Sequence, residues 1–300
     1  MSIQLFVADK ALRVLMKRRF RNKPEIMELR AIMAGFARRP AGVPAGVAIS
    51  HIELGDVPTE LLRSEDANDR AALLYIHGGG FVGGTPVNHR ALTGRLADQI
   101  GIPVYAVDYR LAPEHPFPAG LDDAVAAYRG LLDKGIAPGA IVVGGDSAGG
   151  NLTLTMALKL KALGLPMPAT LVCLSPVTNL VEAPPSHTVN AQSDAMFEGR
   201  MFDTVLAAYC PNDNPSNPFI SPLYGDVAGL PPTLIQCSEI EMLRDDSVMM
   251  ADRLRAAGVT VVLETWPRVF HVWQVVPQFL PEARRAIERI VAFVNLHLKA

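Results

Sequence analysis

A short turn between an apolar segment and a helical segment constrains this chain more than any other feature. Residues Gly145–Gly149 read Gly-Asp-Ser-Ala-Gly; they follow the apolar run Ala140–Gly144 and open a helical pattern over Ala148–Leu163. The small residues around Ser147 permit a sharp strand-to-helix turn, which exposes the serine oxygen and points helix N–H groups toward it. The sequence therefore predicts a nucleophilic serine at position 147. A glycine-rich turn that serves only packing is the alternative.

From about residue 46 onward, apolar strands alternate with amphipathic helices. This alternation predicts the α/β class, with a mostly parallel sheet that helices cover on both faces. The expected strands are Val47–Leu54, Leu61–Arg63, Ala71–Ile76, Pro103–Asp108, Ala140–Gly144, Thr170–Leu174, Thr233–Cys237 and Val259–Thr265. The expected helices are His89–Ile100, Leu121–Lys134, Ala148–Leu163, Ser247–Ala257 and Pro281–Leu298.

Residues 182–231 interrupt this alternation. A break at Glu182–Ser186 precedes a helical stretch over Ser193–Cys210 and a loop from Pro211 to Pro222 that is rich in Pro, Asn and Ser. A long insertion between two strands is typical of a functional or flexible segment. Because it follows a strand, we expect a lid near residues 182–220.

The first forty residues differ from the rest in charge. They hold ten Lys and Arg against three acids, a net charge of +7, so the remaining chain carries −9. Apolar residues recur at helical spacing on both sides of Pro24, which predicts two short helices that pack on a larger body through their apolar faces. A membrane-surface anchor is the alternative. The apolar positions are Leu5, Ala8, Leu12, Leu15, Met16, Ile26, Leu29, Ile32, Met33 and Phe36.

Composition excludes several classes of protein. A net charge of −2 argues against a nucleic-acid binder that relies on positive charge. The two long uncharged windows, Ala71–Asn88 and Ala162–Val181, contain Gly or Pro and cannot form membrane helices, so we expect no stable membrane anchor. Cys173, Cys210 and Cys237 form neither a disulfide framework nor a zinc pattern. We therefore expect no metal and a reducing cytoplasm.

A second glycine-rich segment, His77–Phe81, ends another expected strand with the sequence His-Gly-Gly-Gly-Phe. Three consecutive glycines are costly unless the backbone must approach a ligand. In an acyl-transfer enzyme, their N–H groups would stabilise the oxygen that becomes negative in the tetrahedral intermediate. A phosphate-binding loop is the rival, but the chain lacks Gly-x-x-x-x-Gly-Lys-[Ser/Thr] and a clear dinucleotide unit. We expect His77 to brace this loop rather than to act as a base.

A nucleophilic serine needs a base and an acid that orients the base. Among the seven histidines, His271 follows the strand Val259–Thr265 by six residues, where a base could reach over the end of the sheet. Candidate acids lie in Ser238–Asp246, after the strand Thr233–Cys237. The chain order would then be serine, acid, histidine.

Four segments together resemble the hormone-sensitive-lipase-like family of α/β-hydrolase esterases: His77–Phe81, Asp108–Ala119, Gly145–Leu152 and His271–Trp273. The resemblance covers roughly residues 45–300 and implies an α/β-hydrolase fold with a helical cap. It implies hydrolysis of carboxylic esters with short acyl chains through an acyl-enzyme, without a cofactor. Residues 1–45 would form the cap segment, and residues 46–300 the catalytic domain with its lid.

The resemblance also assigns the site. It makes Ser147 the nucleophile, His271 the base and Glu241 the acid, although Glu241-Met242-Leu243 stands where the family usually has an acid followed by Pro-Leu. Asp245 is the alternative acid; for both Asp245 and Asp246 the structural alternative is capping of the next helix. A second departure is Ser175–Asn179, where family members often read Ser-Pro-Trp-x-Asp.

The remaining expectations concern supporting groups and rival functions. The N–H groups of Gly78, Gly79 and Ala148 would form the oxyanion hole. Asp146 would tie the turn to neighbouring loops, and Asp108 and Arg110 would brace the oxyanion loop. An amidase or deacetylase would use the same triad. A non-catalytic receptor on this fold would lack the catalytic histidine, which is present here. The expected partner is a small-molecule ester, and the sequence leaves a homodimer open.

Overall fold

The computed structural model describes residues 2–20, 25–37, 42–197 and 200–299. Within these ranges, eight strands form one sheet in the order β1-β2-β4-β3-β5-β6-β7-β8. The pairs β1–β2 and β2–β4 are antiparallel, and the other five pairs are parallel. The strands are β1 Val47–Leu54, β2 Val57–Ser64, β3 Ala72–Ile76, β4 Val104–Val107, β5 Ile141–Asp146, β6 Thr170–Leu174, β7 Thr233–Ser238 and β8 Val261–Trp266.

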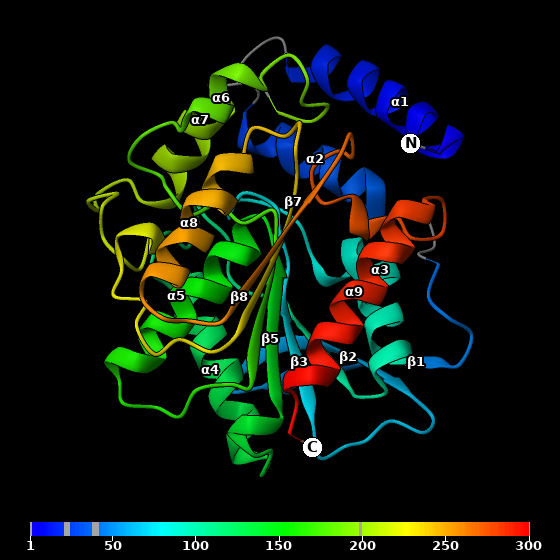
Figure 1. The fold of residues 1–300 in the computed structure, drawn as a ribbon, viewed down its shortest axis with the longest axis vertical. Helices are drawn as coiled ribbons and strands as arrows, with labels where there is room; N and C mark the ends of the chain where they lie inside the picture. Colours follow the sequence, from blue (N-terminus) through cyan, green and yellow to red (C-terminus); the bar gives the residue numbers. More distant parts are fainter. Residues whose placement is uncertain (1, 21–24, 38–41, 198–199, 300) are drawn as a thin grey trace.

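Helices cover the sheet on both faces, and this confirms the predicted class. In Figure 1, α4, α5 and α8 lie on one side of the sheet and α3 and α9 on the other. The helices are α1 Ile3–Phe20, α2 Ile26–Ala37, α3 Pro86–Ile100, α4 Ala119–Asp133, α5 Ala148–Ala162, α6 Pro185–Val189, α7 Arg200–Tyr209, α8 Arg244–Ala256 and α9 Pro281–His297. Short 3₁₀ helices are η1 Pro138–Ala140, η2 Pro222–Tyr224 and η3 Trp273–Val275.

The central strands are apolar because both of their faces are covered. Every residue of β3, β5, β6 and β7 is buried, as expected for parallel strands between two helix layers. The edge strands differ: in β1 and β8, exposed and partly buried residues alternate or mix. The first hairpin turns at Gly55 and Asp56, both with positive φ, which matches the right-handed twist of the strands it joins.

Most expected elements are confirmed within a few residues, and two boundaries move for identifiable reasons. Helix α3 begins at Pro86 rather than at His89 because Thr85 and Asn88 form a capping box with Pro86 at the first helical position. The second strand of the hairpin begins at Val57, four residues earlier than expected, because its whole length pairs with β1.

The insertion is folded differently from the prediction. Helix α6 begins at Pro185, inside the segment expected to be a break; proline is tolerated there because a first helical residue needs no N–H partner. The helical stretch expected over Ser193–Cys210 is reduced to α7. The side chain of Asp194 accepts the N–H groups of Met196 and Phe197, so this part forms a turn.

Helices α1 and α2 lie at the end of the molecule toward which the parallel strands point (Figure 1). Leu5 of α1 is fully buried among Trp273, Leu280 and Ala283, whereas Leu15, expected on the packed face, is exposed. The predicted separation of these helices at Pro24 lies outside the described residues. Within the described ranges, every helix falls short of the length and apolar character that a membrane crossing requires.

Candidate active site

Ser147 occupies a strained turn between β5 and α5. Its φ of 53° and ψ of −118° lie outside the usual regions for a residue with a side chain, and the residue is 8 % exposed. A Cβ atom at Gly149 would collide with the carbonyl oxygen of Ile76, and one at Gly145 with that of Gly149. Because Gly145 and Gly149 have no side chains, the turn can pack closely against the end of β3. Packing alone does not require strain at a serine, so the strain favours a functional role.

His271 and Glu241 form a tight buried pair. His271 Nδ1 lies 2.6 Å from Glu241 Oε2, and both side chains are almost fully buried. The other carboxylate oxygen, Oε1, accepts hydrogen bonds of 2.8 Å from Ser175 Oγ and from the N–H of Ser238. Both oxygens of Glu241 are thus held in place. The pair orients the imidazole through Nδ1 and leaves Nε2 on the opposite side of the ring.

The two other candidate acids have different partners. Asp245 binds the N–H of Ser186 and the guanidinium of Arg244. Asp246, fully buried, accepts the N–H groups of Thr178 and Asn179. Both acids lie in the first turn of α8, as the capping alternative expects, but α8 has no side-chain cap bond. Their carboxylates instead join the start of α8 to the segments after β6.

The glycine loop requires a correction to the predicted oxyanion donors. The N–H of Gly78 donates to Asp146 Oδ1 at 3.0 Å, so it is not free to bind a substrate oxygen. Gly79 and Gly80 both have positive φ, 134° and 62°. Among the described residues, no acceptor is bound to the N–H of either one. Together with Ala148, at the first turn of α5, they are the donors that this loop leaves open. Gly80 was missed because a string of glycines does not reveal which N–H is already bonded.

Asp146 joins three elements around Ser147, as expected. Besides Gly78, it binds Tyr75 Oη at 2.8 Å and His89 Nε2 at 3.1 Å. Burial alone would raise the pKa of Asp146, but the charge of His89 and the hydrogen bonds outweigh it and lower the pKa. Burial alone would lower the pKa of His89, and the Asp146 carboxylate reverses this and raises it. A buried ion pair thus fixes β5 and the glycine loop to α3.

His77 braces the loop as a neutral ring. Its Nδ1–H donates to the carbonyl oxygen of Gly78 at 2.8 Å, and its ring stacks on Tyr109 with 4.4 Å between centroids. Burial, aided by the charge of His89, lowers the pKa of His77 to about 4. His77 is therefore uncharged at neutral pH.

Among the described residues, the expected braces Asp108 and Arg110 make no hydrogen bond or ion pair with this loop. Arg110 instead binds Asp123 of α4 at 2.7 Å, and Asp108 donates its N–H to Pro58 of β2. The residue between them, Tyr109, supplies the brace: its hydroxyl donates to the carbonyl oxygen of His77 at 3.0 Å.

Residues of the insertion cover the site. The ring of Phe197 lies 4.5 Å from the His271 ring, centroid to centroid, and Tyr209 stacks on Phe81 at 3.7 Å. A Cβ atom at Gly80 would lie 3.3 Å from Val205 of α7. No sequence motif marks these contacts, since they depend on how the insertion folds back.

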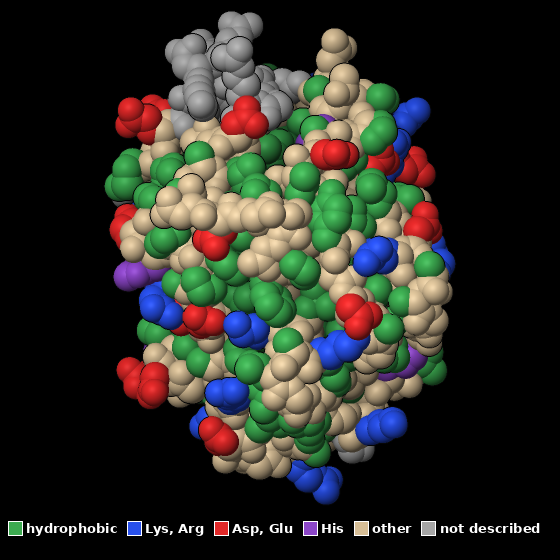
Figure 2. Space-filling model, turned by 90° about the vertical axis from the view of Figure 1, so that its left-hand side faces the viewer, with side chains coloured by type: hydrophobic (Ala, Val, Ile, Leu, Met, Phe, Trp, Pro, Cys, Tyr) green, Lys and Arg blue, Asp and Glu red, His purple; other side chains and the backbone are tan. Residues whose placement is uncertain are grey.

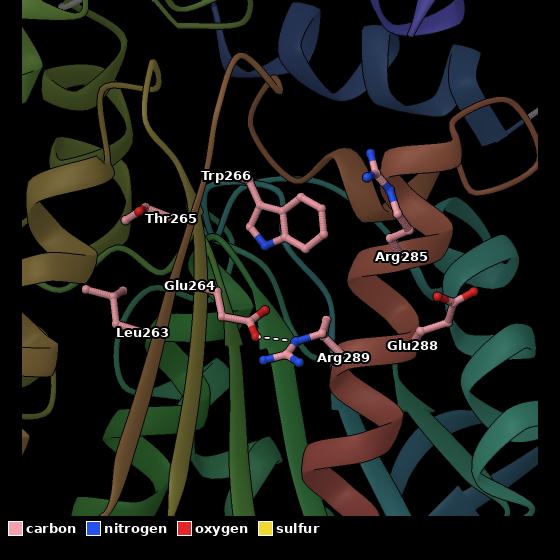
Figure 3. A pocket seen from close by; sticks show the side chains of 7 residues that line it. All are labelled: Leu263, Glu264, Thr265, Trp266, Arg285, Glu288 and Arg289. Atoms are coloured by element: carbon pink, nitrogen blue, oxygen red, sulfur yellow. Dashed lines mark hydrogen bonds and ion pairs between the residues drawn. The ribbon is translucent and has the colours of Figure 1, made fainter. Parts of the chain in front are cut away.

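Two open cavities lie beside the triad rather than on it. One of about 610 Å³ lies between β8 and α9, where Glu264 and Arg289 pair at 2.7 Å near Trp266 (Figure 3). The other, about 550 Å³, lies between α2 and the glycine loop and is lined by Gly83 and Gly84. In the part of the chain that the structure describes, no cluster of His, Cys, Asp and Glu is suited to hold a metal ion.

Comparison with known proteins gives consistent matches. Residues 73–275 match a family described by its alpha/beta hydrolase fold. The chain is 40 % identical to an acetyl-hydrolase of Streptomyces hygroscopicus over 85 % of this chain and 84 % of that one. It is 36 % identical to an esterase of Acinetobacter venetianus over 83 % and 82 % of the two chains. A crystal structure of an esterase from the bacterial hormone-sensitive lipase family superposes with a TM-score of 0.93 and 37 % identity, covering 100 % of this chain and 99 % of that one.

Proposed function

This chain belongs to the alpha/beta hydrolase family, on its hormone-sensitive lipase branch, and we propose that Ser147, His271 and Glu241 are the catalytic triad of a carboxylic-ester hydrolase. The observation that supports this most is the 2.6 Å contact between His271 Nδ1 and Glu241 Oε2, which orients a base at the same end of the sheet as the strained Ser147 turn.

The proposed reaction proceeds in two halves. Ser147 Oγ attacks the ester carbonyl while His271 Nε2 takes the serine proton, and Glu241 stabilises the resulting imidazolium. The N–H groups of Gly79, Gly80 and Ala148 bind the carbonyl oxygen as it becomes negative. His271 then gives its proton to the leaving alcohol, and an acyl-enzyme remains. Water then attacks the acyl carbon and loses a proton to His271. The bond between this carbon and Ser147 Oγ breaks, His271 returns the proton to Oγ, and the carboxylic acid leaves.

The substrate that we propose is a small ester with a short acyl chain, used without a cofactor. The support is the cover over the site: Phe197 lies on the base, and Val205 lies over Gly80. We further propose that residues 1–45 act as a cap segment and residues 46–300 as the catalytic domain, with a lid near 182–220. A reducing cytoplasm agrees with three buried thiols, at Cys173, Cys210 and Cys237, that form no disulfide.

The decisive test replaces the nucleophile. A fluorophosphonate probe should label Ser147 in the native protein, and Ser147→Ala should lose both labelling and ester hydrolysis while its melting temperature stays close to that of the native protein. Turnover that persists in Ser147→Ala would exclude this mechanism.

A panel of p-nitrophenyl esters from acetate to palmitate, with a matched anilide, separates the remaining alternatives. We expect the highest kcat/KM for the short esters and little cleavage of the anilide. Preferred cleavage of the anilide would favour an amidase. Absence of turnover on every substrate would favour a receptor.

A further inference from the structure

Helix α1 presents apolar side chains on two opposite faces. The inner face holds Leu5 and Met16, which are buried. The outer face carries Ile3, Val7 and Val14, which are 81 %, 58 % and 65 % exposed. These three positions recur at the spacing of one helix face. Packing on the body explains the first face, but the described part of the chain leaves the second uncovered. Phe6, 50 % exposed, and Lys10 lie beside the same outer stripe.

Such exposure is concentrated on this helix. Of the fourteen large apolar side chains exposed in the described part of the chain, five lie on α1. The face over α5, α7 and α8 is different, because acidic and basic side chains are interspersed there among the apolar ones (Figure 2). Single exposed apolar residues need no explanation, but a continuous stripe marks an interaction surface.

The charge of the α1 sequence indicates the partner of this face. Helix α1 holds five Lys and Arg against one acid, a net charge of +4. Lys10 lies beside the stripe, and the helix sequence continues with Lys17, Arg18 and Arg19. An apolar helix face with an excess of cations matches an anionic lipid surface, where the helix lies in the interface. A second copy of this chain would instead bring two segments of like charge together. We propose that the outer face of α1 docks the protein reversibly on anionic membranes.

Docking through α1 would place the end of the molecule that carries the proposed active site next to the membrane. Helix α1 lies at the end of the molecule where the parallel strands terminate (Figure 1), which is also the end that carries Ser147 and His271. Its inner residue Leu5 shares a cluster with Phe270, the neighbour of His271. If the proposed esterase function holds, a docked enzyme meets esters that partition into the membrane. The apolar face of a single interfacial helix binds weakly, so the contact is reversible.

The experiment is vesicle co-sedimentation with the full chain. Native protein should sediment with phosphatidylglycerol vesicles, sediment much less with phosphatidylcholine vesicles, and be released as salt rises above about 0.15 M. The double variant Phe6→Ser/Val7→Ser should bind anionic vesicles at least about tenfold more weakly, because two apolar side chains no longer enter the interface. Lys10→Glu should weaken binding in the same direction. The matched control is Leu296→Ser, at a 77 % exposed position near the end of α9, and it should bind like the native protein.

The outcomes separate this inference from the proposed function. All four proteins should hydrolyse a water-soluble short ester equally well, so loss of docking with intact hydrolysis supports the inference. The inference is overturned if native protein ignores anionic vesicles, or if the double variant and Leu296→Ser bind alike. It is also overturned if size-exclusion chromatography shows that the double variant turns a dimer into a monomer without affecting vesicle binding, since the stripe is then a subunit interface.

Discussion

At the scale of single residues, Glu241 holds the proposed base in place. Its carboxylate holds His271 Nδ1 at 2.6 Å and is itself held by Ser175 and Ser238. Glu241→Gln should therefore reduce kcat by up to ~10⁴-fold, because an amide cannot stabilise the imidazolium and favours the wrong tautomer. The melting temperature should change little, since an amide of nearly the same size fills the same space.

The matched control for Glu241→Gln is Asp245→Asn, on the same segment. Asp245 binds Ser186 and Arg244 and is only partly buried, so its variant should lose a modest amount of stability and keep nearly all of its turnover. Steady-state kinetics and thermal unfolding of both variants decide the matter. Were Asp245→Asn inactive and Glu241→Gln active, the acid would be misassigned.

His77 makes a prediction about pH. Its ring stays neutral in the fold because burial lowers its pKa to about 4, whereas the unfolded chain binds the proton near the ordinary value of 6.5. The unfolded state thus holds more protons between these values, and folding stability falls as the pH drops from 6.5 toward 4. The loss amounts to roughly 3 kcal/mol.

Removing the titrating ring tests this directly. His77→Asn should destabilise the protein at neutral pH, and its deficit relative to the native protein should shrink as the pH falls. Urea unfolding at several pH values between about 7 and 4 measures the change. A deficit of His77→Asn that stays constant over this pH range would mean that the ring is not held neutral.

The residues of the proposed triad could be selected from the sequence, but the hydrogen bonds that support them could not be predicted. Ser147 and His271 lie where motif and strand position place them, because the ends of parallel strands meet at one edge of the sheet. The oxyanion donors were harder, since the choice between Gly78 and Gly80 depends on which N–H Asp146 already binds. That depends on the φ values of the loop, which three identical residues cannot encode.

At the scale of elements, apolar segments of the sequence predicted the strands accurately. The same kind of pattern predicted the helices of the insertion poorly. Strands β3, β5, β6 and β7 are fully buried, so their sequences read as continuous apolar segments. In the insertion, the side chain of Asp194 competes with the helix for backbone N–H groups. A helical apolar pattern does not show this competition, and the predicted helix there was too long.

Asp194 gives the prediction at this scale. Its buried carboxylate accepts the N–H groups of Met196, Phe197 and Met242, and so joins the loop over His271 to the segment that bears Glu241. Asp194→Asn places amide hydrogens against these donors. The loop should shift, and kcat should fall by up to about 100-fold.

The matched control for this positioning role is Asp203→Asn, an exposed carboxylate on α7. It should leave kcat unchanged. Equal kcat in Asp194→Asn and Asp203→Asn would show that Asp194 does not position the loop over His271.

At the scale of the whole molecule, the sheet assembles a site from distant parts of the chain. Ser147 follows β5, Glu241 follows β7 and His271 follows β8, and these strands are close together at one side of the sheet. The sequence could predict the α/β class from alternation, but not that β4 lies between β2 and β3. Strand order depends on which crossovers pack together, and a linear pattern carries little information about it.

Contacts from both N-terminal helices lead to this site. Leu5 is fully buried in a cluster that includes Val269 and Phe270, directly before His271. Arg30 donates to the carbonyl oxygens of Val82 and Ala112, next to the glycine loop. Deleting residues 1–35 should therefore reduce kcat/KM, lower the melting temperature and increase binding of a hydrophobic dye to the uncovered cluster.

A point variant separates packing from mere truncation. Leu5→Ala leaves the chain complete but opens a cavity in a fully buried position, so the free energy of unfolding should fall by about 2–5 kcal/mol. Ile3→Ala, on the exposed side of the same helix, should change it by no more than about 0.5 kcal/mol. Because Leu5 supports the segment that carries His271, Leu5→Ala should also reduce kcat/KM for short esters, and Ile3→Ala should not. Equal stability and activity in the two variants would show that α1 is not packed on the catalytic body, and the cap role proposed for residues 1–45 would then fail with it.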